Sequence, residues 1–176
     1  MVNKQIIQLG EFECPDGKMV ISDPCYDIGI WCQAFMNNFM KGAYKATATT
    51  GDIDGWGNRC LRLSIAYAAL SEDDISKFKF NPESFDIGVD SGQCGFFALE
   101  HYKDDSIIKE FSDDWYDYIW EYVVGKDNNG KYRNFGVMPF GTVSFSGLGD
   151  GSYTLYTHKN LDGLVDAAYV SYIDED

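Results

Sequence analysis

The chain has 176 residues, enough to bury a core, and we expect residues 1–176 to form a single domain. Hydrophobic residues make up 45% of it, which argues against a disordered protein. Its net charge of −14, with only 14 Lys and Arg, argues against direct contact with nucleic acid, because phosphate contacts depend on those residues. The acidic excess favours a basic partner or a cation instead.

The first residues lack the apolar core of a signal peptide, and no apolar run is long enough to span a membrane. We therefore expect a cytoplasmic protein without membrane contact. Five cysteines form no Cys-x-x-Cys pair, and only two histidines could join them, which argues against a zinc site or a disulfide framework. We expect reduced thiols, no metal and no cofactor.

The amino-terminal part begins with a predicted hairpin. Strands are expected at Gln5–Glu13 and Met19–Ser22, joined by a turn at Pro15–Lys18. Apolar residues then recur every three or four positions from Ile28 to Met40, which predicts a helix over residues 27–40 that ends before Gly42.

Two further strands are expected at Tyr44–Thr50 and Arg59–Ala69, on either side of a loop at residues 51–58. Ser71 and Asp74 resemble a capping box at the start of a short helix.

The central stretch, Phe85–Tyr102, combines a strand-like apolar pattern with three glycines, Gly88, Gly92 and Gly95. A glycine within a strand marks a bulge, a bend, or a close approach by another backbone or a ligand. The short polar side chains between them belong to Asp90, Ser91 and Gln93. This pattern indicates either the floor of a binding site or a buried turn that satisfies its own hydrogen bonds.

After this stretch, one apolar stripe predicts a helix over Asp104–Val124, stopped by Gly125. Hairpin turns are expected at residues 127–130 and 161–163. Strands are expected at residues 131–137, 140–146, 152–158 and 164–173.

These elements predict an α+β fold that is mainly antiparallel β, with about eight strands in a sandwich or a strongly bent sheet. Two substantial helices are expected to pack on it.

Two glycine-rich loops are candidate ligand sites. Asp52, Asp54 and Asn58 alternate as they do at the start of a calcium loop, but Leu63 stands where the twelfth, bidentate ligand would be, so an ordinary hairpin explains them as well. The loop Gly147–Gly151 has no lysine and leads into a strand, which excludes a phosphate loop. It predicts a tight corner in which Asp150 hydrogen-bonds backbone amides.

Cys25 and Cys94 are candidate nucleophiles, with His101 or His158 as the base. Cysteine is also among the residues most often buried, and core packing is the simpler interpretation.

Three ordered motifs resemble a known family: residues 20–26 (Val-Ile-Ser-Asp-Pro-Cys-Tyr) with Trp31-Cys32, residues 88–95 (Gly-Val-Asp-Ser-Gly-Gln-Cys-Gly) and residues 146–153 (Ser-Gly-Leu-Gly-Asp-Gly-Ser-Tyr). The chain is similar to the bacterial and phage family of uncharacterised proteins known as domain of unknown function 4241. It departs from the family pattern at Cys94, where many members carry a small residue. The resemblance implies a mainly β intracellular domain of bacterial or phage origin and supplies no catalytic residue.

Each of these motifs is a bent corner that carries an aspartate beside aromatic residues. If the corners converge, they line one concavity, and a few polar groups among aromatic residues are how small-molecule sites are built. Alternatively, each aspartate satisfies its own turn. The candidate ligand-binding residues are Asp23, Tyr26, Asp90, Ser91, Gln93, Asp150 and Tyr153.

The leading functional hypothesis is a non-enzymatic binding domain for a small polar or nucleotide-like ligand. Such a domain suits a phage accessory protein that sequesters a host signalling molecule. A phosphate-bearing ligand needs cations, for which the candidates are Lys41, Lys45, Arg59, Arg62, Lys131 and Arg133.

Two alternatives belong to other classes: an acidic protein that inhibits a basic, nucleic-acid-binding partner by mimicry, and a cysteine-dependent enzyme. A second copy of the chain is a further partner to consider.

Overall fold

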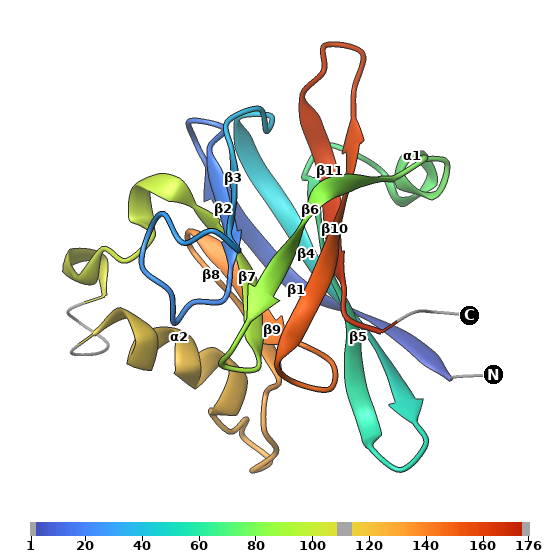
Figure 1. The fold of residues 1–176 in the computed structure, drawn as a ribbon. Coiled ribbons are helices and arrows are strands. Elements are labelled where there is room, and N and C mark those ends of the chain that lie inside the picture. The colour runs from blue at the N-terminus through green and yellow to red at the C-terminus, as the bar shows by residue number, and fades with distance from the viewer. Residues whose placement is uncertain (1–2, 109–113, 174–176) are drawn as a thin grey trace.

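The structure, a computed structural model, describes residues 3–108 and 114–173, and this part of the chain forms two antiparallel sheets and two α-helices (Figure 1). The predicted α+β sandwich is confirmed. The six-stranded sheet has the order β1 (Lys4–Cys14), β4 (Gly42–Ile53), β5 (Gly57–Tyr67), β11 (Val165–Ser171), β10 (Gly151–Lys159) and β6 (Asn81–Val89). The five-stranded sheet has the order β3 (Ala34–Met36), β2 (Met19–Ser22), β7 (Gln93–Ala98), β9 (Gly141–Phe145) and β8 (Phe135–Met138).

The main core lies between the two sheets. In β2, Met19 and Ile21 join this core, whereas Val20 between them points to the opposite face of the sheet. In β7, Phe96 and Phe97 divide in the same way. Both strands are therefore buried on both faces, which explains why they are continuously apolar.

A second core lies on the outer face of the five-stranded sheet, under helix α2 (Trp115–Val124). The helix buries Trp115, Ile119 and Val123 against that face. In Figure 1 the helix lies on the side of β7 and β9 that faces away from β10 and β11. The five-stranded sheet is thus the middle layer of three.

The helix predicted over residues 27–40 is wrong. Residues 24–32 form turns, Ala34–Met36 form strand β3 on β2, and Phe39 makes an isolated bridge to Val165. The apolar residues do not share one face, because Cys32 and Phe39 are buried whereas the side chain of Trp31 is 92% exposed.

Tertiary hydrogen bonds override the helical spacing in this segment. The side-chain oxygen of Gln33 accepts from the amides of Gly29 and Ile30, both at 3.0 Å, and Gly29 takes a φ of 93° that no helix contains. Helix propensity is weak enough for such contacts to decide the conformation.

The helix predicted over Asp104–Val124 is shorter than expected. A 3₁₀ turn occupies Asp105–Ile107, residues 109–113 lie outside the described part, and α2 begins only at Trp115. Two aspartates mark this start. Asp114 caps the amide of Asp117 at 2.9 Å, and Asp105 accepts from the amide of Trp115 at 2.8 Å.

Other local predictions are confirmed. The capping box at Ser71 and Asp74 starts helix α1 (Glu72–Ser76), and the turns before Gly17, Gly130 and Gly163 close by backbone hydrogen bonds. The described chain holds eleven strands rather than about eight, mainly because residues 34–36 form strand β3 instead of helix and because the central stretch divides into β6 and β7. Strand β8 starts at Phe135 rather than at residue 131.

Candidate functional site

Asp23 is a fully buried residue after β2, and its carboxylate joins the first two motifs. One oxygen accepts from the amides of Asp90 and Ser91 at 2.8 and 2.6 Å. The other accepts from the Ser91 hydroxyl at 2.7 Å and from the amide of Cys25 at 2.8 Å. Four bonds fill the acceptor sites of a carboxylate. Asp23 therefore acts as a tie between two turns, with no capacity left for a ligand.

Tyr26 and Asp90 form a second link between the same motifs. The Tyr26 hydroxyl donates to the carboxylate of Asp90. This hydrogen bond, together with burial, raises the pKa of Tyr26 above its usual range. Behind it, the buried Tyr102 hydroxyl donates to the backbone oxygens of Tyr26 at 2.8 Å and Asp23 at 3.1 Å.

The third motif meets the second at the turn between β6 and β7. The amide of Ser146 donates to the oxygen of Gly92 at 2.9 Å, and a Cβ added to Gly92 would lie 3.9 Å from the Cα of Gly149. The Ser146 hydroxyl and the Tyr153 hydroxyl both donate to the oxygen of Gly149, at 2.7 and 2.5 Å. The predicted tight corner is thus confirmed, and Tyr153 closes it.

Asp150 and Gln93 are placed differently from the other candidates. Register in the β6–β10 pair, where Gly151 faces Val89, puts Asp150 beside Asp90, but its side chain is exposed. No described residue hydrogen-bonds its carboxylate, so the predicted amide contacts are not seen. Gln93 is fully buried, and its amide nitrogen donates to the Tyr116 hydroxyl at 3.3 Å while its oxygen has no partner within residues 3–108 and 114–173.

The three motifs therefore converge, as one of the two interpretations expected, but the aspartates do not line a hollow. Asp23 and Ser91 use their side chains to hold the turns together. The hollow lies next to this cluster, across Gly92.

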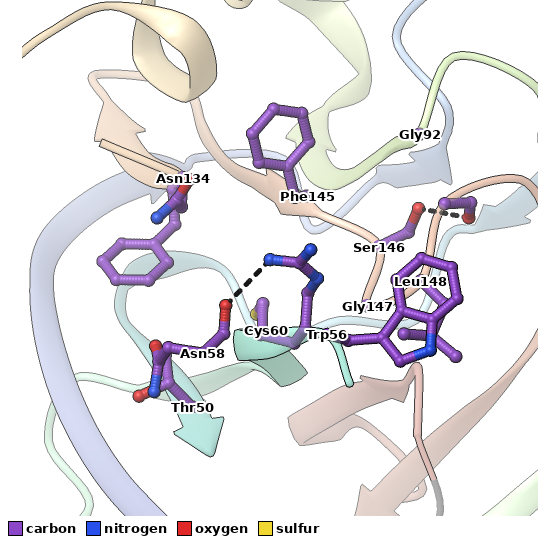
Figure 2. Close-up of a pocket in the computed structure, with 13 residues that line it drawn as sticks. Thr50, Trp56, Asn58, Cys60, Gly92, Asn134, Phe145, Ser146, Gly147 and Leu148 are labelled. Atoms are coloured by element: carbon purple, nitrogen blue, oxygen red, sulfur yellow. Dashed lines mark hydrogen bonds between the residues drawn. The ribbon is translucent and has the colours of Figure 1, made fainter. Parts of the chain in front are cut away.

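A pocket of about 320 Å³ opens beside the glycine corner, the tight turn at Gly147–Gly151 (Figure 2). Its walls come from the β4–β5 hairpin, the start of β8, the loop after β9, and Gly92. Figure 2 shows Phe145 and Asn134 on the side opposite Thr50 and Asn58. The loop Ser146–Gly149 of the third motif forms a further wall.

Arg59 is the charged side chain among the described residues that line this pocket. Its guanidinium donates to the backbone oxygen of Asn58 at 3.1 Å (Figure 2), and no carboxylate among the described residues pairs with it. The Thr50 hydroxyl is buried at the pocket wall without a hydrogen-bond partner in the described part of the chain. A buried hydroxyl that lacks a partner carries a free-energy cost that a ligand or a water can remove.

Aromatic side chains provide the rest of the wall. Phe135 and Phe145 are half-buried, and Trp56 at the hairpin tip is 53% exposed, which leaves its ring available at the pocket mouth. Asn134 has a φ of 67°. Its backbone N–H donates to the backbone oxygen of Val123, and its backbone oxygen accepts from the backbone N–H of Phe145, which fixes its position in the pocket wall. Asparagine tolerates this left-handed conformation better than most residues.

The candidate cysteines are not arranged as nucleophiles. Burial, with a smaller contribution from Asp23, raises the pKa of Cys25 to about 12, and burial raises that of Cys94 to about 12. The reactive thiolate is therefore scarce at neutral pH. His158 binds Asp166 at 2.6 Å and stacks on Phe78, and neither histidine hydrogen-bonds a cysteine within the described ranges.

The loop at residues 51–58, the candidate calcium site, closes on itself as a hairpin tip. The Asn58 amide donates to the Asp52 carboxylate at 3.2 Å, and the Trp56 amide donates to the oxygen of Ile53. Across the described residues, no three His, Cys, Asp or Glu side chains cluster closely enough to hold a metal ion. Over the same residues, every helix is too short or too polar to cross a membrane.

Comparison of the chain with models of known families, with curated proteins and with solved structures gives no match. The resemblance to the domain of unknown function 4241 family stays a prediction.

One side of this pocket is predictable from the sequence and the other is not. The third motif and Arg59 are candidates from the sequence, the latter for binding phosphate. Trp56, Asn134 and Phe145 are not, because they lie far apart along the chain. A weak signal is present, since Phe145 lies just before the glycine corner and Trp56 stands between two glycines.

Proposed function

We propose that the protein is a non-enzymatic binding domain whose pocket beside the β4–β5 hairpin holds a small ligand with a planar aromatic ring and an anionic group, as in a nucleotide. The observation that carries this proposal is Arg59, which lines the pocket without a carboxylate partner in the described chain.

Charge makes this arginine informative. The chain has twice as many acidic as basic residues, 28 against 14, so a cation would ordinarily find a carboxylate partner. Arginine offers five N–H donors in a planar fork that matches carboxylate and phosphate oxygens. Among the described residues, the guanidinium of Arg59 donates one hydrogen bond, to the backbone oxygen of Asn58, which leaves its other N–H groups for an anion.

The remaining lining suits an aromatic ring. Trp56, Phe135 and Phe145 offer ring faces or edges, and the amides of Asn58 and Asn134 offer donors and acceptors for ring substituents. The volume of about 320 Å³ lies at the lower end of the range of about 300–1,000 Å³ for small-molecule sites. One ring with one anionic group fits this size better than a dinucleotide.

The residues that line the pocket favour binding of a ligand over its chemical conversion. The described lining residues include no Asp, Glu or His that could act as a general acid or base. Burial raises the pKa of Cys60, the one cysteine among them, to about 12. A domain of this kind sequesters its ligand, the role expected of an accessory protein that withdraws a signalling nucleotide.

The test measures affinity for the four common nucleoside 5′-monophosphates and for the matching nucleosides by calorimetry. At least one monophosphate is expected to bind more tightly than its nucleoside. Arg59→Gln should lower the affinity for that monophosphate at least tenfold and leave the affinity for its nucleoside almost unchanged. The reason is that a hydrogen bond to a charged group contributes about 1.5–3 kcal/mol, and a tenfold change in affinity is about 1.4 kcal/mol.

The matched control is Lys77→Gln, which removes one positive charge from the C-cap of α1 and should leave the affinity for the monophosphate within twofold of wild type. Ligand recovered after incubation should have its original mass. The proposal fails if the folded protein binds no member of the panel, if Arg59→Gln and Lys77→Gln behave alike, or if the ligand is converted. Denaturing freshly purified protein and identifying released molecules by mass would extend the panel to the natural ligand.

A further inference from the structure

The loop between β2 and β3 carries an unusual exposed apolar surface, which we call the tryptophan loop (residues 27–31). The side chain of Trp31 is 92% exposed, Ile28 is 54% exposed and Ile30 is 37% exposed. Single exposed apolar residues are common, but here three lie within four positions of one loop, and a concentration of exposed apolar side chains is typical of an interaction site.

The tryptophan loop is held from inside by buried polar groups. The Gln33 side chain accepts from the amides of Gly29 and Ile30, and its nitrogen donates to the Ser22 hydroxyl at 2.9 Å. Tyr102 anchors the residue just before the loop through the oxygen of Tyr26 at 2.8 Å. Gln33 and Tyr102 are themselves only 8% and 3% exposed. The apolar side chains are therefore presented by a fixed backbone, which lowers the entropy cost of binding.

Carboxylates border the loop. The Asp27 side chain is 92% exposed, and Asp90, bound by Tyr26, is exposed next to Asp150. Asp86 is exposed on β6, two residues from Gly88, whose amide donates to the oxygen of Cys32 at 3.0 Å.

Lys103, a cation beside these carboxylates, is turned inward. The ammonium of Lys103 donates to the oxygen of Cys25 at 3.3 Å and lies 4.0 Å from Asp27, with its side chain 23% exposed. The border of the tryptophan loop thus presents negative charge to a partner.

We propose that the tryptophan loop docks a basic partner protein, with Trp31 inserted into an apolar groove that the partner borders with Lys and Arg. Tryptophan is the residue type most often found at the energetic centre of an interface, and an acidic border selects a basic counterpart. A second copy of the chain would bring four like charges against this border and a net charge of −14 against −14. No residue of the tryptophan loop lines the pocket of the β4–β5 hairpin, so different variants test the two proposals.

The test uses random 12-residue peptides displayed on phage, selected on the wild-type protein. Enriched peptides should combine large apolar residues with an excess of Lys and Arg over the starting library. A synthetic copy of the best peptide should bind at least tenfold more weakly to Trp31→Ser and more weakly in 0.5 M salt than in 0.05 M salt. The control variant Tyr132→Ser removes another exposed aromatic residue (62% exposed), and its affinity for the peptide should stay within twofold of the wild-type value.

Because Trp31 is almost entirely in solvent, Trp31→Ser is expected to keep the wild-type melting temperature, which separates loss of docking from loss of fold. The proposal is overturned if no peptide is enriched, if enriched peptides are neutral or acidic, or if they bind Trp31→Ser as well as wild type. Dimerisation in sedimentation, or binding to phosphatidylcholine vesicles, that Trp31→Ser abolishes would also overturn it by identifying a different occupant.

Discussion

The carboxylate of Asp23 lies out of solvent and accepts four hydrogen bonds, two to each oxygen. Three of the donors belong to Asp90 and Ser91, which are 67 and 68 positions away along the chain. Burying a charge is costly unless it is fully hydrogen-bonded. Because this one is, Asp23 fixes the end of β2 against the turn between β6 and β7.

Asp23→Asn should therefore destabilise the protein by roughly 2–4 kcal/mol, because in either orientation the new NH₂ group would face at least one backbone N–H donor, which cannot accept a hydrogen bond. Urea unfolding followed by circular dichroism measures the change.

Asp150→Asn is the control at the exposed end of the third motif. It removes the same charge from a side chain without a hydrogen-bond partner in the described structure, so the free energy of unfolding should change by less than about 0.5 kcal/mol. Equal effects of the two substitutions would show that Asp23 is not the tie described above.

At the scale of elements, the glycines of the central stretch mark close contacts within the protein. A Cβ on Gly88 would lie 2.7 Å from the Cβ of Cys32, and Gly92 turns the chain with a φ of 69°. In β7, a Cβ on Gly95 would lie 2.4 Å from the backbone oxygen of Thr142 in β9. The expected close approach is thus made by neighbouring protein atoms at Gly88 and Gly95.

Gly95→Ala is predicted to cost about 3 kcal/mol or more, because the added methyl group meets a backbone oxygen that cannot move without breaking the β7–β9 pair. Thermal and urea unfolding check this value.

Gly163→Ala separates steric contact from backbone strain. Gly163 has a φ of 77° but no atom within 4 Å of an added Cβ. We expect a cost of only about 1 kcal/mol there, from the left-handed backbone alone. A cost at Gly95 no larger than at Gly163 would contradict the packing described for β7.

Elements were predictable where pattern and burial agree. The alternation in β5 and the turn residues before Gly17 and Gly163 gave correct strands and turns, because period two and positive φ are local properties. The helix over residues 27–40 failed because its apolar residues serve two purposes: Phe39 enters the core and Trp31 faces solvent. Nothing in the spacing distinguishes these roles.

The candidate site follows the same division. Convergence of the three motifs could be inferred from their shared composition. Whether the Asp23 carboxylate keeps a free acceptor site for a ligand could not, since that depends on where the N–H and O–H donors of Ser91 lie in the folded chain. The pocket requires Arg59 of β5 to meet Phe145 of β9 and Asn134 just before β8, and the packing of one sheet on the other brings these residues together.

At the scale of the whole molecule, the sandwich buries thiols rather than pairing them. Cys14, Cys60 and Cys94 lie in the core between the sheets, and burial raises the pKa of each to about 12. In the unfolded chain, a cysteine ionises with a pKa of about 8.5. The folded state therefore holds protons that the unfolded state releases.

A folded pKa above the unfolded one means that this stability is complete below about pH 8.5 and is lost as the pH rises toward 12. We predict that the free energy of unfolding falls between pH 9 and 11, by about 1.4 kcal/mol per pH unit for each such thiol. Urea unfolding under reducing conditions at several pH values measures the slope.

Cys94→Ala should make this slope shallower by about 1.4 kcal/mol per pH unit. Val170→Ala, in the same core, also leaves a cavity but removes no titrating group, and its slope should match that of the wild type. If the two variants share one slope, the thiol of Cys94 does not remain protonated in the folded state through this range.

The tie at Asp23 also bears on the order in which the chain assembles. Three of its four donors belong to the turn between β6 and β7, so they reach the carboxylate only after β2 has paired with β7. These three hydrogen bonds therefore stabilise the finished sandwich more than the structures that precede it. Interactions that form late in folding mainly set the unfolding rate rather than the folding rate, so we expect Asp23 to slow unfolding.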